Sequence, residues 1–433
     1  MSDTRHLSTE ADERIENRSC DLPDDMLLRI FYFVPTKVAA ATAVLSKRWR
    51  HIWTMMPQIS FKDEGSESLE QALQLHKAPK LECLLFILCS VHVDVRKFVE
   101  NAVKRGVEVV EFEYNLIGVP TRLPKILYTC DTLVDLTLSN QILVDVSSQA
   151  RLPSLLYLML MNVVYKDEDS LVSLLSSSPV LEYIKVFRRK NDMLKNFTVK
   201  VPSLKRLYYW TPLERDHHHD PTGWLVIDSP AITNMELYDV WGNYCLLENM
   251  HCLDEAYIGN VPNPDGKLLT CLSSARRLLL HLTEPMVHCC SATNFSRLIE
   301  LHFLTATSVD WLEPLMFLLQ NSPKLKTLFI NTKWAGTLTP SWNQPNSIPE
   351  CLSSHLEIFG WRDCVATEDE KQLLAYILAN SKCLKAVEIS LFATKLTSCN
   401  LEETQKEIES MPRISTSSQL RFPTQLNWNF RVY

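Results

Sequence analysis

Three short clusters in this chain carry residue types that could do chemistry. Residues 217–220 read His-His-His-Asp, which offers imidazole and carboxylate ligands of the kind that hold zinc. Residues 288–290 read His-Cys-Cys, which could pair a thiol nucleophile with a base. Residues 167–169 read Asp-Glu-Asp, which could bind a cation. Each cluster would need a fold that directs its side chains toward one spot.

None of the three clusters has the spacing that its chemistry requires. Adjacent histidines in a loop do not converge on one ion, and catalytic thiols are usually paired with bases from distant segments. The acidic cluster lies where a helix begins, and carboxylates are favoured at that positive end of the helix dipole. The nine glycines are too few for a clustered phosphate-cradling loop. The sequence therefore predicts no catalytic residue, no metal site and no cofactor; an enzyme built on residues 217–220 remains an alternative that bound metal would reveal.

The first sixty residues predict three short helices that are rich in large apolar side chains. The Pro-Asp-Asp run at residues 23–25 is typical of a first helical turn, and Pro35 ends that helix. Thr36 is expected to cap the second helix, and Trp49 and Trp53 share one face of the third because they are four residues apart. Three helices in about forty residues make too small a core to stand alone. Some of these side chains must therefore be covered by another protein.

Residues 18–56 resemble an F-box, in the form found in large plant families. The resemblance rests on Leu22 and Pro23, followed at the expected distance by Leu-Ser-Lys-Arg-Trp-Arg at residues 45–50. It implies that the segment binds the Skp-type adaptor of a cullin-RING (SCF) ubiquitin ligase. Carried over by position, it implies adaptor contacts at Leu22, Pro23, Ile30, Val44, Lys47 and Trp49.

The composition is that of a multi-part globular chain: 433 residues, of which 46% are apolar and 22% charged. The net charge of −7 comes without a long basic run, so no nucleic-acid partner is expected. No apolar run has membrane-spanning length, and the N-terminus is polar and acidic, unlike a signal peptide. Thirteen cysteines without a disulfide spacing fit a reducing compartment. We therefore expect a protein of the cytoplasm and/or nucleus, with no membrane partner.

The middle of the chain repeats the template apolar-x-x-apolar-x-apolar at intervals of 21 to 31 residues. The second and third apolar positions are two residues apart, so in a strand both point to one side and stack on the next copy. No single copy can bury its set without neighbours, which predicts a curved solenoid with parallel strands on one face and helices on the other. The copies begin at Leu81, Val107, Leu133, Leu155, Leu181, Leu204, Ile232, Leu253, Ala275, Leu298, Leu325, Leu356 and Leu384.

This pattern resembles the irregular leucine-rich repeats that follow an F-box in plant proteins. The resemblance implies an α/β chain in which a small three-helix F-box precedes the solenoid. The sequence departs from regular repeats in one respect. The buried asparagine expected after each strand is missing, because Asn140, Asn162 and Asn260 fall elsewhere. A regular asparagine ladder is therefore not expected.

Residues 341–422 resemble the FBD domain that ends many such proteins, through a Trp-x-x-Pro opening and the run Tyr-Ile-Leu-Ala-Asn at residues 376–380. Thr367 is expected to cap a helix there. A solenoid needs a terminal cap to cover its last apolar face, and this segment fits that role. The predicted organisation is a polar tail (1–17), an F-box (18–58), a linker (59–80), leucine-rich repeats (81–340), an FBD domain (341–422) and a C-terminal tail (423–433).

The resemblances together imply the substrate-recognition subunit of an SCF-type E3 ubiquitin ligase, with no active site of its own. Its partners would be the Skp-type adaptor, the cullin-RING ligase reached through it, and an unidentified target protein. A repeat scaffold that binds partners without a ligase role is the alternative. In a horseshoe the outward strand positions line the concave side, where aromatic residues and arginine are typical interface anchors. Those positions include Tyr183, Lys185, Arg206, Tyr208, Tyr257 and His302, with Trp210 just beyond a strand.

Overall fold

The computed structural model describes residues 22–62, 66–89, 94–115, 118–190, 193–212, 223–241, 243–289, 293–305, 310–332, 342, 344–392 and 398–423. Residues 1–17, 217–220 and 424–433, for which the sequence predicts two tails and a histidine cluster, lie outside this set. The chain divides into two compact units, Met1–Val180 and Leu181–Tyr433, and each is described by itself.

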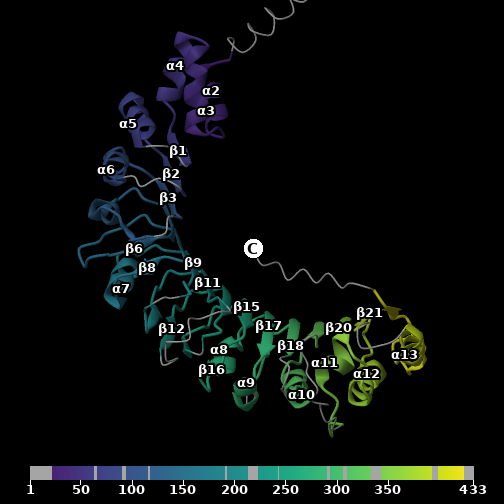
Figure 1. The fold of residues 1–433 in the computed structure, drawn as a ribbon. Coiled ribbons are helices and arrows are strands. Elements are labelled where there is room, and N and C mark those ends of the chain that lie inside the picture. Colours follow the sequence, from purple (N-terminus) through teal and green to yellow (C-terminus); the bar gives the residue numbers. More distant parts are fainter. Residues whose placement is uncertain are drawn as a thin grey trace, which may run out of the picture. The chain divides into compact units, whose positions relative to one another are not determined.

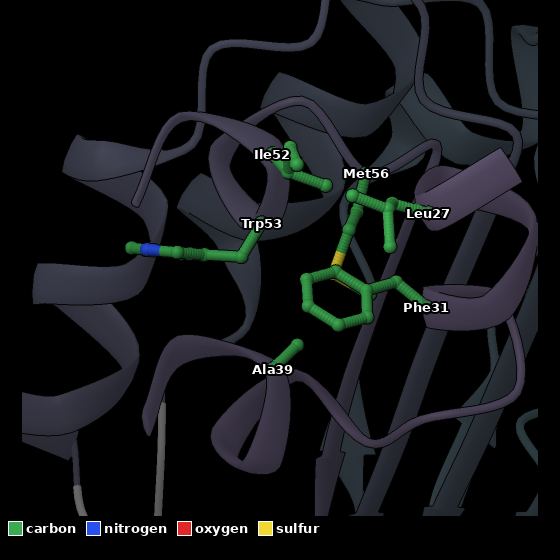
Figure 2. Close-up of a cluster of buried hydrophobic side chains, with 6 residues drawn as sticks. All are labelled: Leu27, Phe31, Ala39, Ile52, Trp53 and Met56. Carbon is green, nitrogen blue, oxygen red and sulfur yellow. The ribbon is translucent and has the colours of Figure 1, made fainter. Parts of the chain in front are cut away.

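The N-terminal helices enclose a small apolar core. The helices are α2 (Asp24–Phe31), α3 (Thr36–Ala41), η1 (Thr42–Val44) and α4 (Lys47–Thr54). Leu27 and Phe31 lie one turn apart on α2 and both point into this core, as the apolar spacing predicts. Figure 2 shows the cluster, whose buried members are Leu27, Phe31, Ala39, Ile52, Trp53 and Met56.

The predicted cap of the second helix is wrong in its detail. Thr36 is the first residue of α3, and Pro35 precedes it without a side-chain cap. The Thr36 hydroxyl instead accepts a hydrogen bond from the backbone N–H of Ser60 at 2.8 Å. The reason is tertiary, because the following strand passes alongside α3 and brings an N–H that needs an acceptor. Helix α4 does have a side-chain cap, since Ser46 accepts from the N–H of Trp49 at 3.3 Å.

The segment predicted as a linker contains a strand and a helix. Strand β1 (Gln58–Lys62) pairs in parallel with β2 (Cys83–Leu88), and α5 (Ser66–Leu75) connects them. Met56, Ile59 and Phe61 are fully buried and repeat the apolar-x-x-apolar-x-apolar template. The repeats therefore begin one copy earlier than the sequence reading placed them. Met56 also belongs to the core of the N-terminal helices, so that core and the first repeat are continuous.

The first unit contains one parallel sheet with the strand order β1-β2-β3-β5-β7 and a smaller one with the order β4-β6-β8. Figure 1 shows α5, α6 and α7 along one side of the larger sheet. The remaining strands are β3 (Val109–Tyr114), β4 (Thr121–Arg122), β5 (Asp135–Asn140), β6 (Ile142–Val144), β7 (Tyr157–Met161) and β8 (Val164–Tyr165). The remaining helices are α6 (Arg96–Lys104), η2 (Lys125–Thr129) and α7 (Glu168–Ser176).

The second unit repeats this arrangement. Its main sheet has the order β9-β11-β13-β15-β17-β18-β19-β20-β21-β22, and a second sheet has the order β10-β12-β14-β16. The main strands are β9 (Tyr183–Phe187), β11 (Arg206–Trp210), β13 (Asn234–Tyr238), β15 (Glu255–Gly259), β17 (Arg277–Leu282), β18 (Glu300–Thr305), β19 (Thr327–Asn331), β20 (Ile358–Cys364), β21 (Ala386–Leu391) and β22 (Gln419–Arg421). The second sheet contains β10 (Phe197–Val199), β12 (Trp224–Asp228), β14 (Tyr244–Glu248) and β16 (Asn263–Pro264). The helices are α8 (Leu268–Leu272), α9 (Glu284–Cys289), α10 (Leu312–Gln320), α11 (Glu350–Ser354), α12 (Glu368–Asn380) and α13 (Ser398–Ser410).

The repeat prediction is confirmed at every predicted copy, since the three template positions of each are buried. Within each unit, equivalent positions are paired in register. Leu84 lies opposite Val110, and Val110 opposite Leu136, so the same apolar positions stack from strand to strand. Each large side chain buried in this way contributes about 1.5–3 kcal/mol. The fold class is therefore an α/β solenoid of parallel strands that follows a helical N-terminus.

Asparagines end several strands by adopting a left-handed backbone. Asn140, Asn162, Asn249 and Asn260 have φ of 65°, 55°, 57° and 44°. Each is the last residue of its strand or the residue directly after it, and none is buried. Asparagine tolerates this conformation because its short side chain can hydrogen-bond locally. These residues turn the chain out of the sheet, which explains why they do not form the buried ladder of regular repeats.

The segment that resembles an FBD domain continues the main sheet of its unit. Strand β20 pairs with β19, and β21 with β22, all in parallel. The predicted cap at Thr367 is confirmed. Its side chain accepts from the N–H of Glu370, and the Glu370 carboxylate accepts from the N–H of Thr367, which forms a capping box.

A buried histidine joins the N-terminal core to the first repeats. His76 is 7% exposed, and its Nε2 lies 2.8 Å from the carbonyl oxygen of Met56. Its Nδ1 lies 2.8 Å from the guanidinium of Arg105. Burial and the neighbouring guanidinium lower the pKa of His76 from 6.5 to about 4. The neutral ring can therefore donate from Nε2 and accept at Nδ1.

We expect the first unit to lose stability as the pH falls from about 6.5 toward about 4. The unfolded chain takes up a proton at His76 near pH 6.5, whereas the folded chain does so only near pH 4, so protons favour unfolding in this window. Between pH 7 and pH 5 the loss should be about 2 kcal/mol. Thermal unfolding of wild type and His76→Gln at both pH values measures it. The variant should show the smaller drop; an equal drop in both proteins would contradict the assignment.

Candidate functional site

The residues predicted to contact an adaptor lie around α2, η1 and α4, and none is sealed in the core. Val44 and Ile30 are 87% and 48% exposed. The others are exposed (Pro23 and Lys47) or half-buried (Leu22 and Trp49). The structure therefore places all six where another protein could reach them.

The two tryptophans of α4 differ in burial. Trp53 is 4% exposed and belongs to the core cluster. Trp49 is half-buried, with its ring centroid 5.4 Å from that of Phe31. The shared face that the spacing predicts is therefore only partly covered, and Trp49 can support Phe31 while keeping exposed surface.

Several exposed apolar residues of this region were not singled out from the sequence. Among the described residues, seven of the eighteen exposed large hydrophobic side chains lie between Met26 and Leu45. We call them the exposed apolar set: Met26, Ile30, Tyr32, Phe33, Val38, Val44 and Leu45. Phe33 and Leu45 are 85% and 67% exposed. Their signal in the sequence is that residues 26–45 carry more large apolar side chains than the small core of these helices can bury.

Arg48 holds the Leu22–Pro23 segment against α4. Its Nε donates to the Asp24 carboxylate at 2.8 Å, and its guanidinium also donates to the carbonyl oxygen of Leu22. Because one planar guanidinium donates to two neighbouring residues, these hydrogen bonds fix geometry as well as adding attraction. The start of α2 is therefore held in place before any partner arrives. Arg48 has a positioning role that the sequence reading missed.

A second candidate surface lies on the outward positions of β9, β11, β13 and β15. The register places Tyr183, Arg206 and Asn234 in one row across three strands. A second row contains Lys185, Tyr208, Glu236 and Tyr257, and a third contains Phe187, Trp210, Tyr238 and Gly259. We call these three rows the aromatic face. Trp210 is the last residue of β11, not a residue beyond the strand.

The rings of the aromatic face pack against one another. The Trp210 centroid lies 5.0 Å from that of Tyr238, 5.9 Å from that of Phe187 and 6.3 Å from that of Tyr257. Tyr183 and Tyr208 form a further pair with centroids 5.4 Å apart. Contacts at these separations add about 0.5–1.5 kcal/mol per pair beyond burial. The face is therefore held in shape by its own side chains.

A buried carboxylate lies in the middle of the aromatic face. Glu236 is 5% exposed, and burial raises its pKa, while a hydrogen bond with Trp210 and the charge of Lys185 oppose that rise. Burial and the proximity of Glu236 raise the pKa of Tyr257 to about 12. The Lys185 ammonium also lies 5.6 Å from the ring centroid of Phe187. Glu236 carries no strong sequence signal, because a glutamate at an outward strand position is ordinary.

His302 does not join this surface. It is 3% exposed, its Nε2 lies 2.7 Å from the Glu300 carboxylate, and its ring centroid lies 4.7 Å from that of Phe329. Its neighbours therefore cover it, so the His302 side chain is not available for contact with a target protein. The other six residues predicted for target contact are all exposed or half-buried.

The structure describes two of the three chemistry-bearing clusters at least in part, while residues 217–220 lie outside the described residues. Asp167 caps α7, accepting from the N–H of Ser170 at 2.8 Å, so the acidic cluster is explained by a helix start. His288 and Cys289 end α9, and Cys290 lies outside the described residues. No group of three or more His, Cys, Asp or Glu side chains in the described ranges is placed to hold a metal ion. None of the helices described has the length and apolar character needed to cross a membrane.

Comparison with known families matches three parts of the chain. Residues 19–59 match the F-box domain, and residues 344–389 match FBD. Residues 95–220 match the model described as FBD-associated F-box protein At5g56370, LRR repeats. The matched stretches correspond to the exposed apolar set, to part of the repeat array with the first strands of the aromatic face, and to the C-terminal continuation of the sheet.

Similar proteins cover nearly the whole chain. The Arabidopsis thaliana protein At1g22000, named as an F-box/FBD/LRR-repeat protein, is 56% identical over 99% of this chain and 97% of its own length. At1g05080, also from Arabidopsis thaliana and named as an FBD-associated F-box protein, is 42% identical over 95% of this chain and 100% of its own length. The solved LRR protein LIC12759 of Leptospira interrogans covers 87% of this chain and 92% of its own, at 13% identity and a TM-score of 0.37.

The aromatic face depends on Gly259, and its replacement gives a test of the packing. A Cβ there would lie 2.6 Å from Cδ2 of Tyr238 and 3.0 Å from Cε1 of Tyr257. We expect Gly259→Ala to displace both rings and to destabilise the second unit by about 1–3 kcal/mol. Near-UV circular dichroism and thermal unfolding measure this. Gly266→Ala is the matched control, because no atom lies within 4 Å of its added Cβ; equal effects of the two variants would contradict the packing role.

Proposed function

Because this chain belongs to the F-box/FBD/LRR-repeat family of plant proteins, we propose that it serves as the substrate-recognition subunit of an SCF-type E3 ubiquitin ligase. In this role the N-terminal helices bind a Skp-type adaptor, and through it the cullin-RING ligase, while the repeats bind a target protein. The chain needs no active site of its own, since holding the target near the ubiquitin-loaded enzyme supplies the rate enhancement by proximity. We place this activity in the cytoplasm and/or the nucleus.

The exposed apolar set is the observation that carries the adaptor part of the proposal. Val44, Phe33 and Leu45 are between 67% and 87% exposed on a segment of only a few helical turns. Covering each of them would contribute about 1.5–3 kcal/mol, so a partner on this surface gains several such terms at once. The six residues carried over from the F-box resemblance lie in and around the same set.

The junction between the N-terminal helices and the first repeats is packed and hydrogen-bonded, which suits a subunit that must hold its adaptor in one orientation. Met56 packs in the helical core and also begins the first repeat. The N–H groups of Lys77 and Ala78 donate to the carbonyl oxygen of Thr54 at 2.6 and 3.0 Å. Gln58 donates to the carbonyl oxygen of Phe31 at 3.4 Å. An adaptor bound to the helices would therefore be held at a fixed orientation to the first repeats.

The aromatic face is our proposed target surface. It combines packed rings with an exposed Arg206, and tryptophan, tyrosine and arginine are enriched at the energetically dominant positions of interfaces. Lys185 and Glu236 add charged groups to the same rows. Six of the residues predicted from the sequence belong to it: Tyr183, Lys185, Arg206, Tyr208, Trp210 and Tyr257. The ring packing means that little side-chain freedom is lost on binding.

Adaptor binding should be abolished or weakened at least tenfold by Val44→Asp, because the variant places a charge on an apolar surface that must be desolvated. Leu22→Ala with Pro23→Ala should act in the same direction. Titration of a purified Skp-type adaptor by calorimetry measures the loss. Val119→Asp is the control, since Val119 is also 87% exposed but lies outside the exposed apolar set. Unchanged adaptor affinity in the Val44 and Leu22/Pro23 variants would favour the scaffold alternative.

Target capture should be lost when Lys185, Arg206 and Tyr208 are replaced together by alanine, while adaptor affinity stays the same. The measurement is affinity capture from plant tissue with the proteasome blocked, followed by identification of the recovered proteins. Lys200, Arg276 and Tyr244, also in the second unit but outside the aromatic face, supply a matched triple-alanine control. Recovery of the same target by both triple variants would reject the aromatic face as the target surface.

A further inference from the structure

A pocket of about 680 Å³ lies in the first unit, between the N-terminal helices and α5. Residues of α3, η1, α4 and α5 line it, together with Lys77, which follows α5. Pockets that bind small molecules commonly measure about 300–1,000 Å³. The volume therefore suits an organic ligand better than a lone ion or a water molecule.

The walls of the pocket are mainly apolar. Trp53 lines it from α4, Ala72 and Leu75 line it from α5, and two further alanines line it from α3 and η1. Leu75 is 53% exposed, so a large apolar side chain stands open at this site. A planar apolar body placed against Leu75 and the small part of Trp53 that lines the pocket would be removed from water on those sides.

Trp53 also brings an unused hydrogen-bond donor. Its Nε1 is buried and has no hydrogen-bond partner among the described residues. Figure 2 shows the Trp53 ring running away from Phe31 and Met56, with its nitrogen in the outer part of the ring. A buried donor without an acceptor costs about 1–3 kcal/mol, and an acceptor atom on a ligand would remove that cost.

The charged part of the lining is basic. Lys47, Arg50 and Lys77 carry the fixed positive charges, and no acidic residue lines the pocket. In the described part of the chain, no ion pair engages any of these three side chains. A negatively charged group on a ligand could therefore pair with these side chains, because no carboxylate already neutralises them.

We propose that this pocket binds a small organic anion with a flat aromatic body. The body lies against Trp53 and Leu75, the anionic group pairs with Arg50 and Lys77, and an acceptor atom takes the Trp53 N–H. The inference uses only the first unit. Lys47 lines the pocket and is also one of the six residues proposed for adaptor contact. The anionic group is assigned to Arg50 and Lys77, which are not among those six, so the proposal can be tested separately from the ligase proposal.

The test uses the full-length chain and two dyes that share one aromatic body. The first is 8-anilinonaphthalene-1-sulfonate, which is anionic, and the second is N-phenyl-1-naphthylamine, which lacks the sulfonate. Fluorescence titration gives a Kd for each dye with each variant, and thermal unfolding shows whether each variant is folded. Saturable binding of the sulfonate dye by the native chain is expected, and its absence would overturn the proposal.

Arg50→Gln with Lys77→Gln should raise the Kd of the sulfonate dye about tenfold and leave that of the neutral dye unchanged. Lys37→Gln with Lys62→Gln removes the same charge from exposed positions that do not line the pocket, and should change neither Kd. If both double variants weakened binding of the sulfonate dye equally, the effect would come from the overall charge of the protein. That result would contradict a specific site.

Two further variants separate the pocket from the rest of the surface. Ala72→Trp fills the pocket from α5 and should abolish binding of both dyes. Phe33→Ser with Leu45→Ser removes two members of the exposed apolar set and should leave both Kd values unchanged. Loss of dye binding in this second variant would overturn the proposal, because the dye would then be bound by the exposed apolar set. If Ala72→Trp proves unfolded, the Arg50→Gln/Lys77→Gln variant still tests whether the dye binds in this pocket.

Discussion

The structure depends on one constraint: no repeat can bury its own apolar triplet. A strand such as β3 covers Val110 and Phe112 only because the equivalent residues of the strands on either side are stacked in the same register. The parallel pairing serves this stacking, and so do the left-handed asparagines that turn the chain out of several strands. In the first unit the helices α5, α6 and α7 lie along one side of the larger sheet. Local segments therefore have no stable fold apart from their neighbours.

The same constraint creates the surfaces that are free for binding. Alternation along a strand sends one set of side chains inward for stacking and leaves the other set on the outward side. In the second unit that outward side carries Trp210 and its ring neighbours, arranged around the carboxylate of Glu236. Because the inward residues fix the register, the outward residues are held at set positions without being needed for the core. Such positions can change between relatives without loss of the fold.

The N-terminal helices meet the constraint differently. Their core has six buried residues, and one of the six is Met56, which also starts the first repeat. That core is too small to cover every apolar side chain of the segment from α2 to η1. Phe33, which follows α2, and Val44, in η1, therefore remain exposed. Charge and hydrogen bonds at Arg48 and His76 then fix the orientation of the helices. A surface that is both apolar and preorganised is suited to a lasting partner rather than to open water.

The sequence by itself determined the repeat positions, the parallel α/β class, the capping box at Thr367 and the surplus of apolar residues near the N-terminus, because each follows from local spacing. Only the tertiary structure decided that the linker forms β1, that Thr36 serves Ser60 instead of its own helix, and that His302 is covered by Glu300 and Phe329. These outcomes depend on which segments lie side by side. Spacing fixes the side of a strand or helix that a residue occupies, whereas its burial is set by neighbours that are distant in the chain.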